Sequence, residues 1–230
     1  MNPLVRGAAA IAITCSIGAP ALAQTPSPRD TLIRAAFATR DKPQALVLIN
    51  QALAQTQAML ARNAGDHEAR LQQALATGYR GQLNRSPSDA KATRAMLLAL
   101  AAADPRDAET QIAVAGWHLT AVGDLGGFLA GTLLGARKAE GLAALDRAVA
   151  IGGNRAFFPG YAALIRIRVD SGDTAMALRL AERAATAAAP GPIDRIMQRA
   201  AQRLLVPLRA GDGAAASKLA KVLLPFGTIG

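Results

Sequence analysis

The sequence predicts an all-α protein, a right-handed solenoid of antiparallel helical hairpins. Apolar residues recur at spacings of three and four along most of the 230 residues, and short segments rich in Gly, Pro and Asp interrupt them. No stretch alternates apolar and polar residues in the β-branched pattern typical of strands. The clearest hairpin covers residues 161–190, where an apolar helix ends at Ser171-Gly172-Asp173. Small residues then recur on one face of its second helix, at Ala177, Ala181, Ala184 and Ala188.

The first residues have the three parts of an export signal. Residues 1–6 carry a positive charge, residues 7–19 are apolar and uncharged, and Ala21-Leu22-Ala23 is a small-x-small site for signal peptidase. The apolar run is shorter than the ~20 residues that cross a bilayer, so we expect no transmembrane segment once the leader is removed. We therefore predict a cleaved signal peptide at 1–23, a linker at 24–28, and a mature protein in the periplasm of a Gram-negative cell.

Cys15 is the single cysteine, and a lipoprotein signal is a rival interpretation of the leader. Ala12-Ile13-Thr14 fits that signal poorly, because the residue before a lipoprotein cysteine should be smaller than Thr14. If Cys15 leaves with the leader, the mature chain uses neither disulfides nor thiol chemistry. Its stability must then come from packing.

The formal net charge of +10 falls to +9 when Arg6 leaves with the leader. A basic exported protein is attracted to acidic proteins and to anionic lipids or polymers, whereas export makes nucleic acid an unexpected partner. Frequent Arg and Ala throughout the chain are also typical of GC-rich coding bias, which would give the same charge without a function.

Each expected helix is bounded by a local stop signal. Leu32, Ala36 and Phe37 share one face of a first helix that starts near residue 29 and ends before Asp41-Lys42-Pro43. A long second helix ends at Asn63-Ala64-Gly65-Asp66, where Gly suits a helix C-terminus. The remaining helices are expected at 66–83, 88–103, 107–122, 138–151, 155–170, 174–188, 193–208 and 214–224. Four acidic residues at helix starts are expected to act as caps: Asp66, Asp107, Asp124 and Asp173.

The hairpin at 161–190 resembles the tetratricopeptide repeat family. Its matching residues are Tyr161, Leu164, Gly172-Asp173, Ala177, Ala184 and Pro190, with Pro190 about one residue late. Two further segments resemble second helices of that repeat, through Thr93, Leu97, Leu100 and Pro105 and through Gly141, Leu145 and Ala148. The resemblance implies one solenoid over residues 29–230 that presents a concave helical face to a protein partner.

An apolar, glycine-rich insertion at 125–135 departs from the repeat pattern. It follows Gly123-Asp124, where a second helix should begin, and it places Gly127, Gly131 and Gly135 four residues apart. At 11 residues it is too short to span a membrane. Three interpretations remain open. In the first, the insertion is a glycine-rich turn and short helix packed inside the solenoid. In the second, it is a loop that docks a partner or lines a ligand pocket. In the third, it is a surface patch that dips into the membrane interface.

The sequence lacks the motifs of common catalytic and metal sites. His67 and His118 are the only histidines, and neither has a second ligand at metal-binding spacing. No nucleophile elbow, phosphate-binding glycine loop or zinc-protease helix is present. We therefore expect no catalytic residue, no metal site and no cofactor, and we predict that the protein is not an enzyme.

Two groups of residues are candidates for partner binding, and each has a plain alternative. The aromatic residues Tyr79, Trp117 and Tyr161 could equally belong to the core, and His118 beside Trp117 could serve only packing. The basic group lies four apart on one helix face, in a region with 11 basic and five acidic residues between 155 and 221, and it could be a solvated face. The candidates are Tyr79, Trp117, His118, Phe128, Tyr161, Arg195, Arg199 and Arg203.

These observations predict a non-catalytic periplasmic binding or scaffold protein. Its partner would be a protein of the cell envelope, and an anionic lipid or polymer is a second class of partner. The alternative function is a lipid- or solute-binding accessory subunit of an envelope transport system. In that case the insertion at 125–135 would line an apolar pocket, bordered by Phe128 and Leu133.

Overall fold

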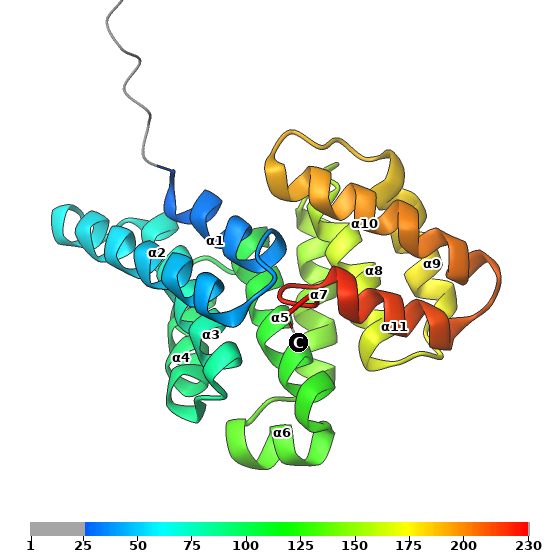
Figure 1. The fold of residues 1–230 in the computed structure, drawn as a ribbon, viewed down its shortest axis with the longest axis horizontal. Helices are drawn as coiled ribbons and strands as arrows, with labels where there is room; N and C mark the ends of the chain where they lie inside the picture. Colours follow the sequence, from blue (N-terminus) through cyan, green and yellow to red (C-terminus); the bar gives the residue numbers. More distant parts are fainter. Residues whose placement is uncertain (1–25, 230) are drawn as a thin grey trace, which may run out of the picture.

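The computed structural model describes residues 26–229, and within that range the protein consists of eleven α-helices and no β-strand (Figure 1). The predicted leader at 1–23 lies outside the described residues. The helices are α1 (Pro28–Phe37), α2 (Lys42–Arg62), α3 (His67–Asn84), α4 (Pro87–Ala103), α5 (Ala108–Leu125), α6 (Gly127–Leu134), α7 (Lys138–Ile151), α8 (Phe157–Val169), α9 (Thr174–Thr186), α10 (Pro192–Arg209) and α11 (Gly213–Leu223). The all-helical prediction is confirmed, and every expected helix is present with α6 in addition.

Local sequence signals explain where several helices begin. The side chains of Ser27, Asp41 and Ser86 each accept a hydrogen bond from a backbone N–H in the first turn of α1, α2 and α4. Proline occupies the first turn of each of these three helices, where a missing N–H leaves no bond unmade. Caps and prolines therefore fix these starts before any packing is considered.

Two of the four predicted acidic caps are confirmed. Asp66 accepts from the backbone N–H of Ala69, and Asp107 accepts from the first turn of α5. Asp124 instead lies in the last turn of α5, so its prediction as a cap is wrong. Asp173 occupies the cap position of α9 but bonds the buried Arg166, at 2.9 Å, and makes no cap bond.

Neighbouring helices pack against one another along the chain. Contacts run from α1 through α2 and α3 to α4, then between α5 and α7, and then from α8 through α9 to α10. α8 also packs against α11, so it has neighbours on several sides. One large apolar cluster draws its buried side chains from every helix between α3 and α11 except α6, and a smaller one joins α1 and α2 to the C-terminal segment.

Small residues let some helices approach closely, as the regularly spaced alanines in the sequence predict. Ala177, Ala181 and Ala184 are fully buried on one face of α9, whereas Ala188 lies beyond its end and is exposed. A Cβ atom on Gly141 would come within 2.7 Å of the Leu119 side chain, so α7 lies directly on α5.

The C-terminal segment, residues 224–229, returns to the first helices of the chain. The backbone N–H of Phe226 donates to the carbonyl oxygen of Ala36 at 2.8 Å, and the Thr228 hydroxyl donates to the carbonyl of Thr39 at 3.3 Å. The Phe226 ring meets Tyr79 edge-on, with 5.0 Å between centroids. Figure 1 shows this end of the chain in the middle of the molecule, between α11 and the helices of the N-terminal half. The C-terminal segment therefore joins the last described helix to the first helices described.

A chain of ion pairs connects the starts of α1, α3, α5, α8 and α10. Arg29 of α1 pairs with Glu68 of α3 and Glu109 of α5, both at 2.6 Å. Glu109 also pairs at 2.8 Å with Arg155, just before α8, and Arg155 reaches Asp194 of α10 at 3.2 Å. Asp194 is fully buried. We call these five residues the ion-pair chain; it holds five helix starts side by side.

Replacing Asp194 with alanine should destabilise the protein strongly. The Asp194 carboxylate also accepts hydrogen bonds from the backbone N–H groups of Phe157 and Gly191, at 3.2 Å each, and these donors would lose their acceptor. Breaking a buried charge pair costs about 3 kcal/mol or more of unfolding free energy. Urea unfolding of Asp194→Ala measures this loss.

The matched control is Arg209→Ala, which breaks the exposed Arg209–Glu182 pair at 3.4 Å. Exposed pairs contribute about 0.5 kcal/mol, so this variant should unfold at nearly the urea concentration of the wild type. Equal losses in the two variants would contradict a structural role for the ion-pair chain.

Candidate functional site

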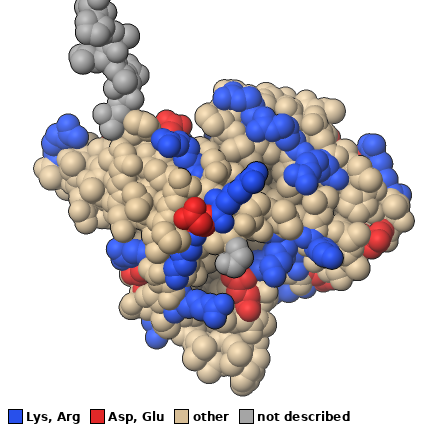
Figure 2. Space-filling view, in the orientation of Figure 1, with Lys and Arg blue, Asp and Glu red and all other residues tan. Residues whose placement is uncertain are grey.

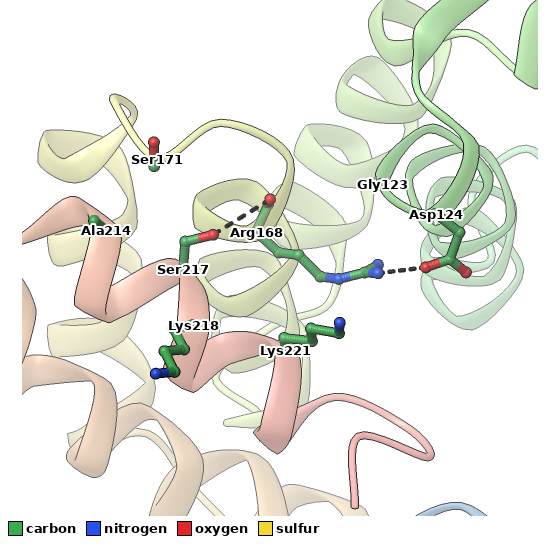
Figure 3. Close-up of a pocket in the computed structure, with 8 residues that line it drawn as sticks. All are labelled: Gly123, Asp124, Arg168, Ser171, Ala214, Ser217, Lys218 and Lys221. Carbon is green, nitrogen blue, oxygen red and sulfur yellow. Dashed lines mark hydrogen bonds and ion pairs between the residues drawn. The ribbon is translucent and has the colours of Figure 1, made fainter. Parts of the chain in front are cut away.

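A pocket with a cationic lining lies between the ends of α5 and α8 and one face of α11 (Figure 3). Its volume is about 510 Å³. The lining residues are Gly123 and Asp124 of α5, Arg168 of α8, Ser171 in the turn after α8, and Ala214, Ser217, Lys218 and Lys221 of α11. We call this the cationic pocket.

Two glycines allow its walls to come together. A Cβ atom on Gly213 would lie only 2.0 Å from the carbonyl oxygen of Ser171, so α11 can start against the turn after α8 only with glycine there. A Cβ atom on Gly123 would lie 2.9 Å from the Arg168 guanidinium, so this glycine leaves room for that side chain. The Ser217 hydroxyl donates to the carbonyl of Arg168 at 3.5 Å, which ties α11 to α8.

Positive charge exceeds negative charge in the pocket. Arg168, whose side chain is only 13% exposed, forms an ion pair with Asp124. Lys218 and Lys221 are exposed, and no acidic oxygen of the described residues lies within 4.0 Å of either ammonium group. In Figure 3, Lys221 extends toward the Arg168–Asp124 pair, while Lys218 points away from it. The Lys221 ammonium, which pairs with no acid among the described residues, lies on the side of the held guanidinium and is suited to bind a carboxylate or phosphate. Lys218 adds positive charge to the same lining.

Of the predicted site residues, Trp117 and His118 lie together, but both are occupied within the fold. The Trp117 indole N–H donates to the carbonyl of Ala90 at 2.9 Å. His118 is 2% exposed, and its Nδ1 accepts from the backbone N–H of Arg137 at 3.1 Å. We infer that the proton of the neutral ring is on Nε2, which faces Glu140 at 3.5 Å. These contacts are those of a packed, buried histidine, which was the alternative interpretation of His118.

The two tyrosines are half-buried and packed against other parts of the chain. Tyr79 lies against Phe226 of the C-terminal segment. The Tyr161 hydroxyl lies so close to Gly116 that a Cβ there would approach it to 2.7 Å, and burial raises the pKa of Tyr161 to about 12. Neither ring belongs to an open aromatic groove.

The three predicted arginines of α10 are exposed on one helix face. Arg195 donates to the carbonyl of Pro190 at 3.1 Å, and Arg199 and Arg203 form no ion pair within the described part of the chain. Figure 2 shows Lys and Arg side chains in a row over α10 and again over α11, on the same face of the molecule. Two basic areas therefore lie on one face of the molecule, over α10 and over α11.

Phe128 lies apart from the other predicted site residues. It is 82% exposed on α6, the short helix that the insertion forms. Only Ala130 of α6 is buried, which does not fit the interpretation of a helix packed inside the fold. Phe128 and Leu133 face solvent instead of a cavity.

Sequence reasoning missed the residues of the cationic pocket. Arg168 and Lys221 come from helices that are far apart in the chain, and Asp124 was assigned to a cap. The one local signal was the spacing of three between Lys218 and Lys221, which places both on one face of α11.

In comparisons with known proteins, no family model, no curated protein and no solved structure matches this chain. Within residues 26–229, no group of three or more His, Cys, Asp or Glu side chains is placed to hold a metal ion. None of the helices described has both the length and the apolar character needed to cross a bilayer.

His118 should make the protein less stable in acid. Burial lowers the pKa of His118 below its usual 6.5; Glu140 opposes this effect, and Arg94 and Arg137 add to it. The unfolded chain therefore binds a proton more readily, and stability falls as pH drops through 6.5. The loss is at most about 1.4 kcal/mol per pH unit for one proton.

The test is urea unfolding of the wild type and His118→Asn at pH 7.5 and at pH 5.5. Asparagine can offer its amide oxygen to the N–H of Arg137 but does not titrate. The variant should lose less stability between the two pH values than the wild type loses. The same pH dependence in both proteins would show that His118 is not the group responsible.

Proposed function

We propose that the protein is a non-catalytic binding protein of the periplasm that holds an acidic segment of a partner protein in its cationic pocket. The observation that carries the proposal is the combination of Arg168, held by Asp124, with Lys218 and Lys221, which pair with no acid among residues 26–229. Arg and Lys side chains stay charged near neutral pH, so they bind carboxylates but are poorly suited to move protons.

The proposed architecture is a right-handed, tetratricopeptide-like solenoid. Helix pairs such as α3 with α4 and α8 with α9 support it, as does the ion-pair chain, which joins the start of the first helix in each expected pair. Stacked pairs of this kind place their first helices side by side along one surface. The basic side chains over α10 lie on the same face of the molecule as those over α11, which supplies the pocket lysines, and would extend the contact with a longer acidic segment.

A hydrolytic function receives less support from the pocket. Ser171 and Ser217 are its only hydroxyl groups, and neither His67 nor His118 lines it to act as a base. The accessory-subunit alternative needs an apolar pocket at the insertion, and Phe128 and Leu133 are exposed. Export to the periplasm rests on the leader-like residues 1–23.

Reversing the charge of the pocket should weaken binding of an acidic peptide about tenfold or more, because two charge-assisted contacts would be replaced by repulsion. The variant is Lys218→Glu/Lys221→Glu, and the probe is a fluorescein-labelled oligoglutamate peptide followed by fluorescence anisotropy. The affinity of the peptide for the wild-type protein should fall as salt is added, because salt screens the attraction between their charges.

The control is Lys42→Glu/Arg179→Glu, which makes the same change in net charge at exposed positions of α2 and α9. It should change the affinity about twofold at most, since distant surface charges are screened. An equal loss in both variants would mean that net charge, and not the pocket, holds the peptide.

Crosslinking in cells tests the proposal at the level of the partner. The tagged wild type should capture one dominant envelope protein in stoichiometric amount, and Lys218→Glu/Lys221→Glu should lose it. Recovery of the wild type without any protein partner would contradict the binding function.

A further inference from the structure

The outer face of α6 is the feature that the proposed function leaves unexplained. Four large apolar side chains are exposed on it or just before it: Leu125 at 40%, Phe128 at 82%, Leu129 at 49% and Leu133 at 55%. The segment 125–135 contains no charged residue. Figure 1 shows α6 projecting at one end of the molecule, and Figure 2 shows a lobe there without basic or acidic side chains. Scattered exposed apolar residues are ordinary in soluble proteins, whereas a cluster of this kind marks an interaction surface.

Basic side chains lie where this lobe joins the rest of the protein. Arg137 follows α6 directly, and its side chain is 73% exposed. The guanidinium of Arg94, on α4, lies 3.6 Å from the position that a Cβ on Gly135 would take, and so sits beside the end of α6. Of the nearby acids, Asp124 pairs with Arg168, whereas Glu140 lies 3.6 Å from Arg137 itself. That pair is exposed, so it is weak and leaves the Arg137 guanidinium accessible to a second anion.

Several polar groups of α6 are satisfied within the segment. Gly135, with φ of +73°, ends the helix in the left-handed conformation. Its N–H donates to the carbonyl of Gly131 at 2.9 Å, and the N–H of Ala136 donates to that of Ala130 at 3.0 Å. The Thr132 hydroxyl donates to the carbonyl of Phe128 at 3.0 Å. Satisfied groups can leave water at small cost, which an unpaired polar group cannot.

We propose that α6 inserts into the surface of an anionic lipid bilayer. Phe128, Leu129 and Leu133 enter the boundary between head groups and acyl chains, while Arg94 and Arg137 contact anionic head groups. At eight residues α6 is about 12 Å long, too short for a hydrocarbon core of about 30 Å, so it lies in the interface. The basic border favours an anionic lipid over an apolar protein surface, and a projecting apolar lobe needs no matching cavity in a bilayer.

Flotation with vesicles tests the proposal. The exported protein, with its processed N-terminus checked by mass spectrometry, is mixed with vesicles of phosphatidylglycerol and phosphatidylethanolamine. The wild type should float with the vesicles. The affinity of Phe128→Ser/Leu133→Ser for the vesicles should be lower by a factor of about ten or more, because the inserted apolar area is lost. Arg137→Gln should weaken binding about fivefold, and added salt should reduce that difference.

The matched control is Val47→Ser/Val206→Ser, which removes apolar side chains of similar exposure, 66% and 73%, from α2 and α10. It should float as the wild type does. All variants should keep the melting temperature of the wild type, and Phe128→Ser/Leu133→Ser should still bind the oligoglutamate peptide. That last measurement separates this proposal from the function of the cationic pocket.

A fluorescent probe reports insertion directly. Cys15 lies in the predicted leader, so Phe128→Cys gives the processed protein a single site for an environment-sensitive dye. Its emission should shift to the blue when anionic vesicles are added, whereas the dye on Val206→Cys should not respond.

Three results would overturn the proposal: no flotation of the wild type, equal flotation of wild type and Phe128→Ser/Leu133→Ser, or no shift at position 128. A wild-type dimer that becomes a monomer in Phe128→Ser/Leu133→Ser, without vesicle binding, would assign α6 to contact with a second copy of the chain instead.

Discussion

The ion-pair chain is the constraint from which the arrangement of the candidate binding surfaces follows. A fully buried carboxylate such as Asp194 is tolerated only when charged and hydrogen-bonding partners surround it, and here Arg155 and two backbone N–H groups do so. Because Arg155 also holds Glu109, the starts of α5, α8 and α10 are fixed beside one another. Helices that begin side by side and run together also end near one another. The Arg168–Asp124 pair at the far ends of α8 and α5, and with it one wall of the cationic pocket, follows from that geometry.

α11 forms the second wall of the cationic pocket. α11 is held on α8 through the close approach at Gly213 and the hydrogen bond of Ser217, which fixes the position of the two pocket lysines. Beyond α11, Phe226 packs against Tyr79 and bonds to Ala36, so the last residues of the chain stabilise the first helices. A simple stack of repeats contacts only its neighbours along the chain. Here the C-terminal segment also contacts α1, which comes first among the helices described, and its Phe226 packs against Tyr79, one of the candidate binding residues.

The cationic pocket and α6 both adjoin the C-terminal end of α5. Asp124 in its last turn faces the pocket, and α6 begins at Gly127, directly beyond the helix. An acidic partner in the pocket and a lipid surface at α6 would therefore be held close together. The two proposals describe one possible arrangement, in which a periplasmic protein keeps its partner beside a membrane, and they rest on different side chains.

Local chemistry was sufficient to predict the helices. The caps Asp66 and Asp107, stop signals rich in Gly and Pro, and apolar spacing all act within a few residues, so the sequence alone determined the all-α class and nearly every boundary. It also showed the excess of positive charge and the unusual insertion at 125–135. Tertiary structure decided what these features do. Asp124 became an ion-pair partner of Arg168 because α8 passes beside the end of α5, and the insertion became an exposed helix because no other helix covers its outer face in the part of the chain described. Such outcomes depend on which distant helices meet, and a pattern that repeats every three or four residues contains no information about that.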